Sequence, residues 1–271
     1  MSTTVDLVTP LRRPGLSATL RSEWIKLASL RSSWLTLAAT AIVMVVIGAV
    51  AAAASASGEA VGAPGSDGSD PLSTVLTGAN FAMLILGVLG CLTGAREYGS
   101  RMITTTFVAT PRRWRVVAAK ALVLTTVVVP VAAIGTFGAY AAGTAVLEGA
   151  GEPTVALSDS GALGSLLGMV LWLTCVSLLG LALGFLLRST ASSIGSLLGV
   201  VLILPPIAGA LLPDSTDAVL QALPSNAAAA FTTITATGDI DISGAVGVVI
   251  VLAWTVGLLA VALRRVVTQD A

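Results

Sequence analysis

Six long apolar runs dominate this chain. Each holds about twenty mostly apolar residues, the length that an α-helix needs to cross roughly 30 Å of hydrocarbon at about 1.5 Å per residue. Of the 271 residues, 55% are hydrophobic and 10% are charged, whereas soluble domains carry roughly 25% charge. The sequence therefore predicts an all-α integral membrane protein with six transmembrane helices, at about 34–54, 76–95, 117–146, 162–187, 194–212 and 244–263.

The lysines and arginines all fall on one side of these predicted spans. They precede the first span, separate the second from the third, and follow the fourth and the sixth. In the opposite loops, all the charged residues are acidic. Lys and Arg in short loops stay cytoplasmic, so both termini are expected in the cytoplasm. We expect a cytoplasmic leader over 1–33, a transmembrane domain over 34–265 and a cytoplasmic tail over 266–271.

Large apolar residues recur at three- and four-residue steps before the first span, at Leu16, Leu20, Trp24 and Leu27. This spacing predicts an amphipathic helix that lies in the membrane interface. Trp24 would then sit at headgroup level, with the basic residues, Lys26 and Arg31 among them, toward anionic lipid. The alternative is a basic leader that only sets the topology.

Several kinds of chemistry find no support in the sequence. The chain has no histidine, and no acidic or basic residue falls in the middle of an apolar run. A metal site, a catalytic site and a proton-coupled pathway are therefore not expected. Neither lysine, Lys26 or Lys120, lies in a phosphate-binding P-loop. We expect no enzyme activity and no cofactor in this chain, and any energy for transport must come from a partner.

Prolines mark two further features. Pro205 and Pro206 lie in the fifth apolar run and should kink or break its helix. A broken helix facing a substrate path and a tolerated kink are equally good interpretations of this pair. In the last outer loop, Pro213–Ser243, we expect two short helices separated at Pro224, forming a re-entrant hairpin.

The stretch from Gly94 to Lys120 is unusually basic and separates the second span from the third. Within it, Ile103 and Phe107 form an apolar pair four residues apart, which predicts a short helix over about 100–109 that Pro111 ends. Its arginines either only anchor the third span or contact a partner. Glu97 either forms a salt bridge within the chain or meets a partner.

Two segments carry a family resemblance. SEWIKLASLRSSWLTLAAT, at 22–40, and EYGSRMITTTFVATPRRWRVVAAK, at 97–120, resemble the corresponding segments of ABC-2 type transporter permeases, in particular the six-span, actinobacterial type. The resemblance implies that the loop between spans 2 and 3 forms a coupling helix, which docks on a separate ATPase subunit. It also implies pairing with a second permease copy, and ATP and Mg bound by the partner ATPase.

Carried over by position, the resemblance implies an ATPase-coupling role for Glu97, Tyr98, Arg101, Thr105, Pro111, Arg112 and Arg113. Arg101 departs from the pattern, because the family usually has Gly there. The expected function is the permease of an exporter in the bacterial plasma membrane, with an amphipathic or apolar substrate and no nucleic-acid partner. The alternative is a membrane immunity or scaffold protein whose basic loop binds another cytoplasmic protein.

Overall fold

In the computed structural model, the described residues are 15–58, 70–99, 113–211, 217–234 and 242–268, and all their regular secondary structure is helical. Six helical segments are long and apolar enough to cross a membrane. They are α2 (Arg31–Ala56), α4 (Gly78–Gly99), α6 (Trp114–Ala150), α7 (Ala162–Leu187), the composite helix Thr190–Leu211 and α12 (Gly244–Thr268). This confirms the predicted all-α fold and its six helices that are long and apolar enough to span a membrane. Most of these helices extend a few residues beyond the apolar runs, because helical backbone hydrogen bonds can continue through polar residues.

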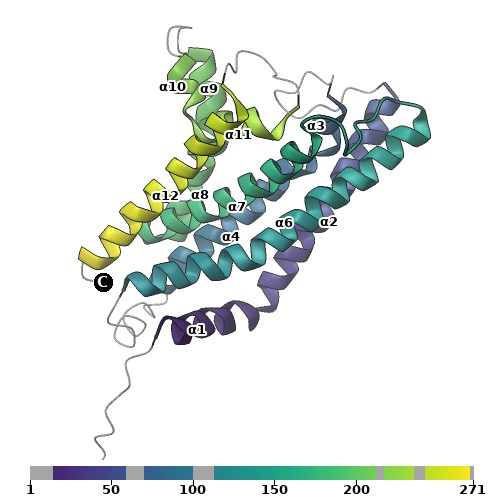
Figure 1. Ribbon diagram of the computed structural model, residues 1–271. Helices are drawn as coiled ribbons and strands as arrows, with labels where there is room; N and C mark the ends of the chain where they lie inside the picture. Colours follow the sequence, from purple (N-terminus) through teal and green to yellow (C-terminus); the bar gives the residue numbers. More distant parts are fainter. Residues whose placement is uncertain (1–14, 59–69, 100–112, 212–216, 235–241, 269–271) are drawn as a thin grey trace, which may run out of the picture.

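The helices form a bundle whose two ends differ in charge. α1 (Leu16–Ala28) lies across one end, together with the C-terminal end of α12 (Figure 1). The described lysines and arginines all lie at this end, which we call the basic end. The short helices α3 (Pro71–Val75), α10 (Asp217–Gln221) and α11 (Pro224–Thr232) lie at the other end.

The tightest helix contact is between α4 and α7, and glycines make it possible. A β-carbon at Gly90 would overlap the carbonyl oxygen of Ser177, and one at Gly180 would overlap the carbonyl oxygen of Gly87. Small residues of this kind let helix backbones approach closely in lipid. At Gly195, by contrast, a β-carbon would meet no described atom within 4 Å.

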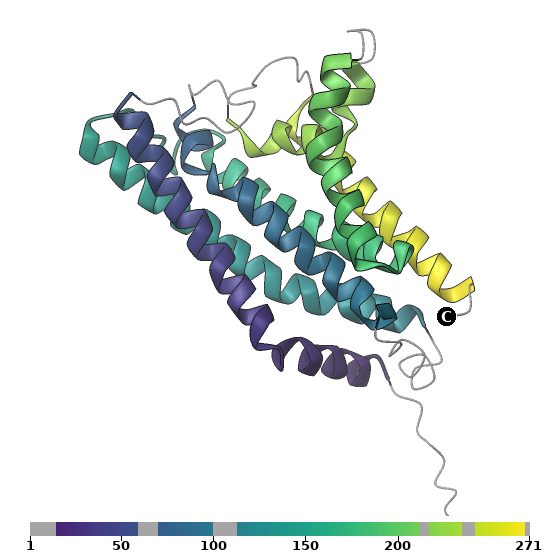
Figure 2. The same ribbon diagram turned by 180° about the vertical axis from the view of Figure 1, so that it is seen from behind.

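The fifth apolar run departs from α-helical geometry just before its two prolines. α8 (Thr190–Leu198) passes into a π-helical turn, η1 (Gly199–Ile203), and then into α9 (Leu204–Leu211). Pro205 and Pro206 have no N–H to donate to the carbonyls four residues earlier, which lie in η1. The π-helical turn absorbs this mismatch, and the helix continues through the prolines. Figure 2 shows this helix on the side of the bundle away from α2, where its α8 segment packs on α4 and α7.

The outer loop contains the two expected short helices, α10 and α11, with Pro224 at the start of the second. Ala227 and Ala228 of α11 are buried and Phe231 nearly so, where α11 packs on α7 and α12. The structure contains no membrane, so re-entry of this hairpin into the bilayer stays a prediction.

Candidate functional site

The basic loop between α4 and α6 is described only at its two ends. The expected coupling helix at 100–109, with Arg101 and Thr105, lies outside the described residues, as do Pro111 and Arg112. Glu97 and Tyr98 lie in the last turn of α4, and Arg113 immediately precedes α6. The described part of the candidate site therefore consists of residues that flank the loop.

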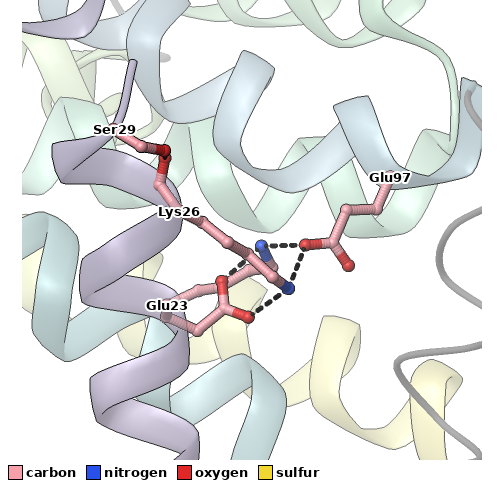
Figure 3. A network of polar contacts seen from close by, with 5 residues as sticks. Glu23, Lys26, Ser29 and Glu97 are labelled. Carbon is pink, nitrogen blue, oxygen red and sulfur yellow. Dashed lines mark hydrogen bonds and ion pairs between the residues drawn. The ribbon is translucent and has the colours of Figure 1, made fainter.

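Glu97 belongs to a cluster of four charged side chains from three helices (Figure 3). We call Glu23 and Lys26 of α1, Glu97 of α4 and Lys120 of α6 the charge cluster. The Lys120 ammonium lies 2.7 Å from Glu23 Oε2 and 2.7 Å from Glu97 Oε1. The Lys26 ammonium lies 2.7 Å from Glu23 Oε1 and 2.9 Å from Glu97 Oε1. Each lysine thus bridges the same two carboxylates.

The charge cluster is mostly buried and formally neutral. The side chains of Glu23 and Lys120 are each 5% exposed and that of Glu97 is 11% exposed, whereas Lys26 is 38% exposed at one edge. Buried charges are costly unless each is paired and hydrogen-bonded, and the alternating arrangement meets that condition. It contains both lysines of the chain.

The pKa of Lys26, at the exposed edge of the charge cluster, depends on two opposing effects. Burial alone disfavours its charged form, but hydrogen bonds and charge attraction from Glu23 and Glu97 outweigh burial and raise the pKa of Lys26 above 10.5. Lys26 is therefore a cation at physiological pH. It remains available to interact with groups outside the cluster.

Helical spacing in α1 brings Glu23 and Lys26 into the charge cluster. Thr19, Glu23 and Leu27 are four residues apart and form the buried face of α1, which packs on α6. Lys26 lies three residues after Glu23 on the same side of the helix, so its ammonium reaches the Glu23 carboxylate. A carboxylate, Glu23, therefore lies on the buried face of α1. Trp24 is 42% exposed on another face.

Tyr98 points to a different group of residues. Its ring packs edge-on against Phe185, with the ring centroids 6.3 Å apart, and the guanidinium of Arg188 lies 5.4 Å above it. Arg188 ends α7 in the left-handed conformation, with φ of 53°. Arg265 of α12 donates to the carbonyl of Leu186, which links the ends of α7 and α12 beside this ring.

Arg113, at the other end of the basic loop, also contacts α12. Its Nη1 atom donates to the carbonyl oxygen of Val266 over 3.4 Å. Two residues in the last turn of α4 therefore contact different helices, Glu97 with α1 and α6, and Tyr98 with α7. Both ends of the loop are tied to packed helices.

The structure brings together some of the predicted site residues and separates others. Lys26 and Glu97 meet directly. Trp24 and Arg31 are exposed at the basic end, outside the charge cluster. Pro205 and Pro206 lie on a separate helix, and among the described residues no group of three or more His, Cys, Asp or Glu is placed to hold a metal ion.

Sequence reasoning missed Glu23 and Lys120 as site residues. The useful signal was Lys120 itself, since it follows the start of a predicted span and a lysine near hydrocarbon needs a counter-ion. No local spacing identifies that counter-ion, because Glu23 is 97 residues away along the chain.

Comparison with known proteins adds no identification: no family model matches the chain, and no curated protein matches it. The case for a function therefore rests on the residues and on their arrangement.

Proposed function

We propose that this chain is the membrane-spanning permease subunit of an ABC exporter of the ABC-2 type, coupled to a separate ATPase subunit that binds ATP and Mg. The support is the resemblance of segments 22–40 and 97–120, together with the six apolar helices. The observation that carries the proposal is the attachment of the basic loop, whose ends contact α1 and α6 through Glu97, α7 through Tyr98, and α12 through Arg113.

In the proposed mechanism, the ATPase pushes on the loop at 100–112, and the attached helices carry the movement into the bundle. Glu97 then acts as a positioning residue, because its Oε1 atom is held by Lys26 and Lys120. Buried ion pairs resist rearrangement, since removing one partner leaves an uncompensated charge. Movement of the end of α4 should therefore be passed to α1 and α6 together.

A second permease copy is part of this proposal. In the most apolar 18-residue stretch of Thr190–Leu211, only 11% is buried, and in the most apolar 18-residue stretch of α12, only 22% is buried. Figure 2 shows both helices on the side of the bundle away from α2. A second copy seated on this side would build the substrate path between two chains, with Pro205 and Pro206 near it. Apolar path walls suit amphipathic or apolar cargo.

The proposed location is the bacterial plasma membrane, with both termini in the cytoplasm. The support is the segregation of charge, because the described lysines and arginines gather at the basic end. Asp70, Glu148, Glu152 and Asp159 lie toward the opposite end. Under the positive-inside rule, the basic end faces the cytoplasm, where an ATPase would dock.

The test is co-purification from the native membrane. We expect the tagged full-length chain to recover a P-loop ATPase whose ATP hydrolysis depends on the permease. Arg113→Glu should insert normally but lose the ATPase, whereas Arg264→Glu, an exposed reversal at the same end of the bundle, should retain it. Recovery of a different cytoplasmic protein and no ATPase would favour the immunity or scaffold alternative. Equal ATPase recovery by both variants would remove the coupling role from Arg113.

A further inference from the structure

A groove of about 590 Å³ runs between the α1–α2 elbow and α4, and the charge cluster forms its floor. The elbow is the two-residue break at Ser29 and Leu30, after which the chain turns from α1 into α2 (Figure 1). Polar residues line the elbow side of the groove, and Leu89, Leu92 and Val123 line its apolar part.

The N-terminus of α2 faces this groove without a cap. The residue at the N-cap position, Leu30, offers no side-chain acceptor, and the first turn of α2 contains no acidic residue. Ser32 and Ser33, in that first turn, both line the groove. The first N–H groups of a helix have no partner within it, and they carry a partial positive charge. An anion is the complementary ligand.

The hydroxyl of Ser33 is a second, independent sign of a ligand. Ser33 is only 7% exposed, lines the groove, and has no side-chain hydrogen bond to any described residue. Its neighbours differ, since Thr36 and Thr40 each donate over 2.8 Å to the carbonyl four residues before them. The Ser33 hydroxyl is therefore open to the groove, and its hydrogen-bonding capacity can be used by a bound molecule.

The charge of the lining agrees with an anionic ligand. Three cations and two carboxylates line the groove, which leaves one net positive charge. Lys26 has three ammonium donors and uses two of them within the charge cluster. Its remaining donor and its 38% exposure leave it accessible from the groove. Arg96 adds a second exposed cation on the opposite wall.

The surroundings of the groove place this polar region at headgroup level. Trp24 and Trp34 flank the elbow and are 42% and 45% exposed, and half-exposed tryptophans are typical of the membrane interface. Leu89, Leu92 and Val123 belong to the spanning helices α4 and α6. A ligand with an anionic head and an apolar chain would match both parts of the groove.

We propose that this groove binds an anionic phospholipid. The phosphate lies at the N-terminus of α2, where it accepts hydrogen bonds from the Ser33 hydroxyl and the Lys26 ammonium. One acyl chain follows Leu89 and Val123 toward the bilayer. The site does not depend on the proposed transport function, because it needs only a membrane-embedded chain.

Native mass spectrometry of the delipidated full-length protein tests this site by titration with phosphatidylglycerol. We expect one tightly bound phosphatidylglycerol per chain, with phosphatidylcholine of the same acyl chains binding more weakly. Loss of one charged or hydroxyl contact should weaken binding about tenfold in Lys26→Gln and about fivefold in Ser33→Ala. Arg31→Gln is the matched control, because it removes a cation at the same helix end that does not line the groove.

The affinities of the variants distinguish a specific lipid site from a diffuse attraction. Arg31→Gln should keep the wild-type affinity within about twofold, since diffuse surface charge contributes little to a specific site. Equal affinity in the wild type, Lys26→Gln and Ser33→Ala would overturn the proposal. So would an equal loss in Arg31→Gln, which would indicate a diffuse attraction. Displacement of the lipid by inorganic phosphate would show a free-anion site in place of a lipid site.

Discussion

Replacing Lys120 with methionine tests whether the charge cluster holds the basic end of the bundle together. Methionine keeps the length and apolar stem of the side chain but removes the charge. Lys120 is 5% exposed and pairs with Glu23 and Glu97, each over 2.7 Å. Its removal leaves two buried carboxylates facing each other, with only Lys26 between them.

The size of the effect follows from burial. Removing one partner of a buried ion pair costs about 3–5 kcal/mol in the free energy of unfolding. We expect the lower end, about 3 kcal/mol, for Lys120→Met, because Lys26 still contacts both carboxylates. Lys26→Met should cost about 1 kcal/mol or less, since Lys26 is 38% exposed and water screens its pairs.

A double-mutant cycle isolates the buried pair. Glu97→Gln alone leaves two lysines and one carboxylate, whereas Glu97→Gln combined with Lys120→Met leaves the balanced pair of Glu23 and Lys26. The double variant should therefore be more stable than the sum of the single losses predicts, by about 1–3 kcal/mol.

The measurement is equilibrium unfolding in mixed micelles of rising SDS content, followed by circular dichroism. Arg21→Gln, an exposed change on α1, is the control and should stay within about 0.5 kcal/mol of the wild type. A Lys120→Met variant that was no less stable than Lys26→Met would show that the buried pairs do not stabilise the bundle. Additive losses in the cycle would show that the side chains of Glu97 and Lys120 do not interact.

Two further predictions use the same assay. Gly90→Ala should destabilise the protein by about 1–3 kcal/mol, because its β-carbon overlaps the Ser177 carbonyl. Gly195→Ala places its β-carbon in open space, so it should be neutral or stabilising, because Ala is the better helix former. Equal effects of the two substitutions would contradict the close α4–α7 contact. Because the pKa of Lys26 is raised, its pairs contribute fully below pH 10.5 and are lost as the pH rises through the folded-state pKa. The stability difference between the wild type and Lys26→Met should thus be constant through neutral pH and close in alkali, and a difference that closed below pH 9 would refute the assigned pairing.

The sequence predicts those features of the fold that are local. Run length and hydropathy identify all six long apolar helices, and Pro224 correctly separates the two outer helices. Glycine spacing is less informative: Gly90 and Gly180 lie in the α4–α7 contact, but Gly195 meets no described neighbour. A small-residue pair shows that a close approach is possible. It does not show whether another helix is there.

The charge cluster shows the limit of sequence reasoning more sharply. Glu97 had two open interpretations, and the structure places its carboxylate in ion pairs with Lys26 and Lys120. These pairs depend on how α1, α4 and α6 pack, because their partners lie 71 and 23 residues away along the chain. Periodicity in α1 indicated which residues share a face, but not that a carboxylate on the buried face would find a lysine of α6.

This arrangement constrains any partner that acts through the basic loop. A partner that drew Glu97 out of the charge cluster would leave Lys120, which is 5% exposed, with Glu23 as its one remaining counter-ion. That state is costly, so pulling on Glu97 must either be resisted or move Lys120 and α1 with it. On the proposed function, a force on the loop would therefore shift α1, α4 and α6 as a unit. Tyr98, one residue further along α4, would carry the same displacement to Phe185 and Arg188 at the end of α7. The adjacent pair Glu97 and Tyr98 is thus the point at which movement of one loop would reach α1 and α6 through one residue and α7 through the other.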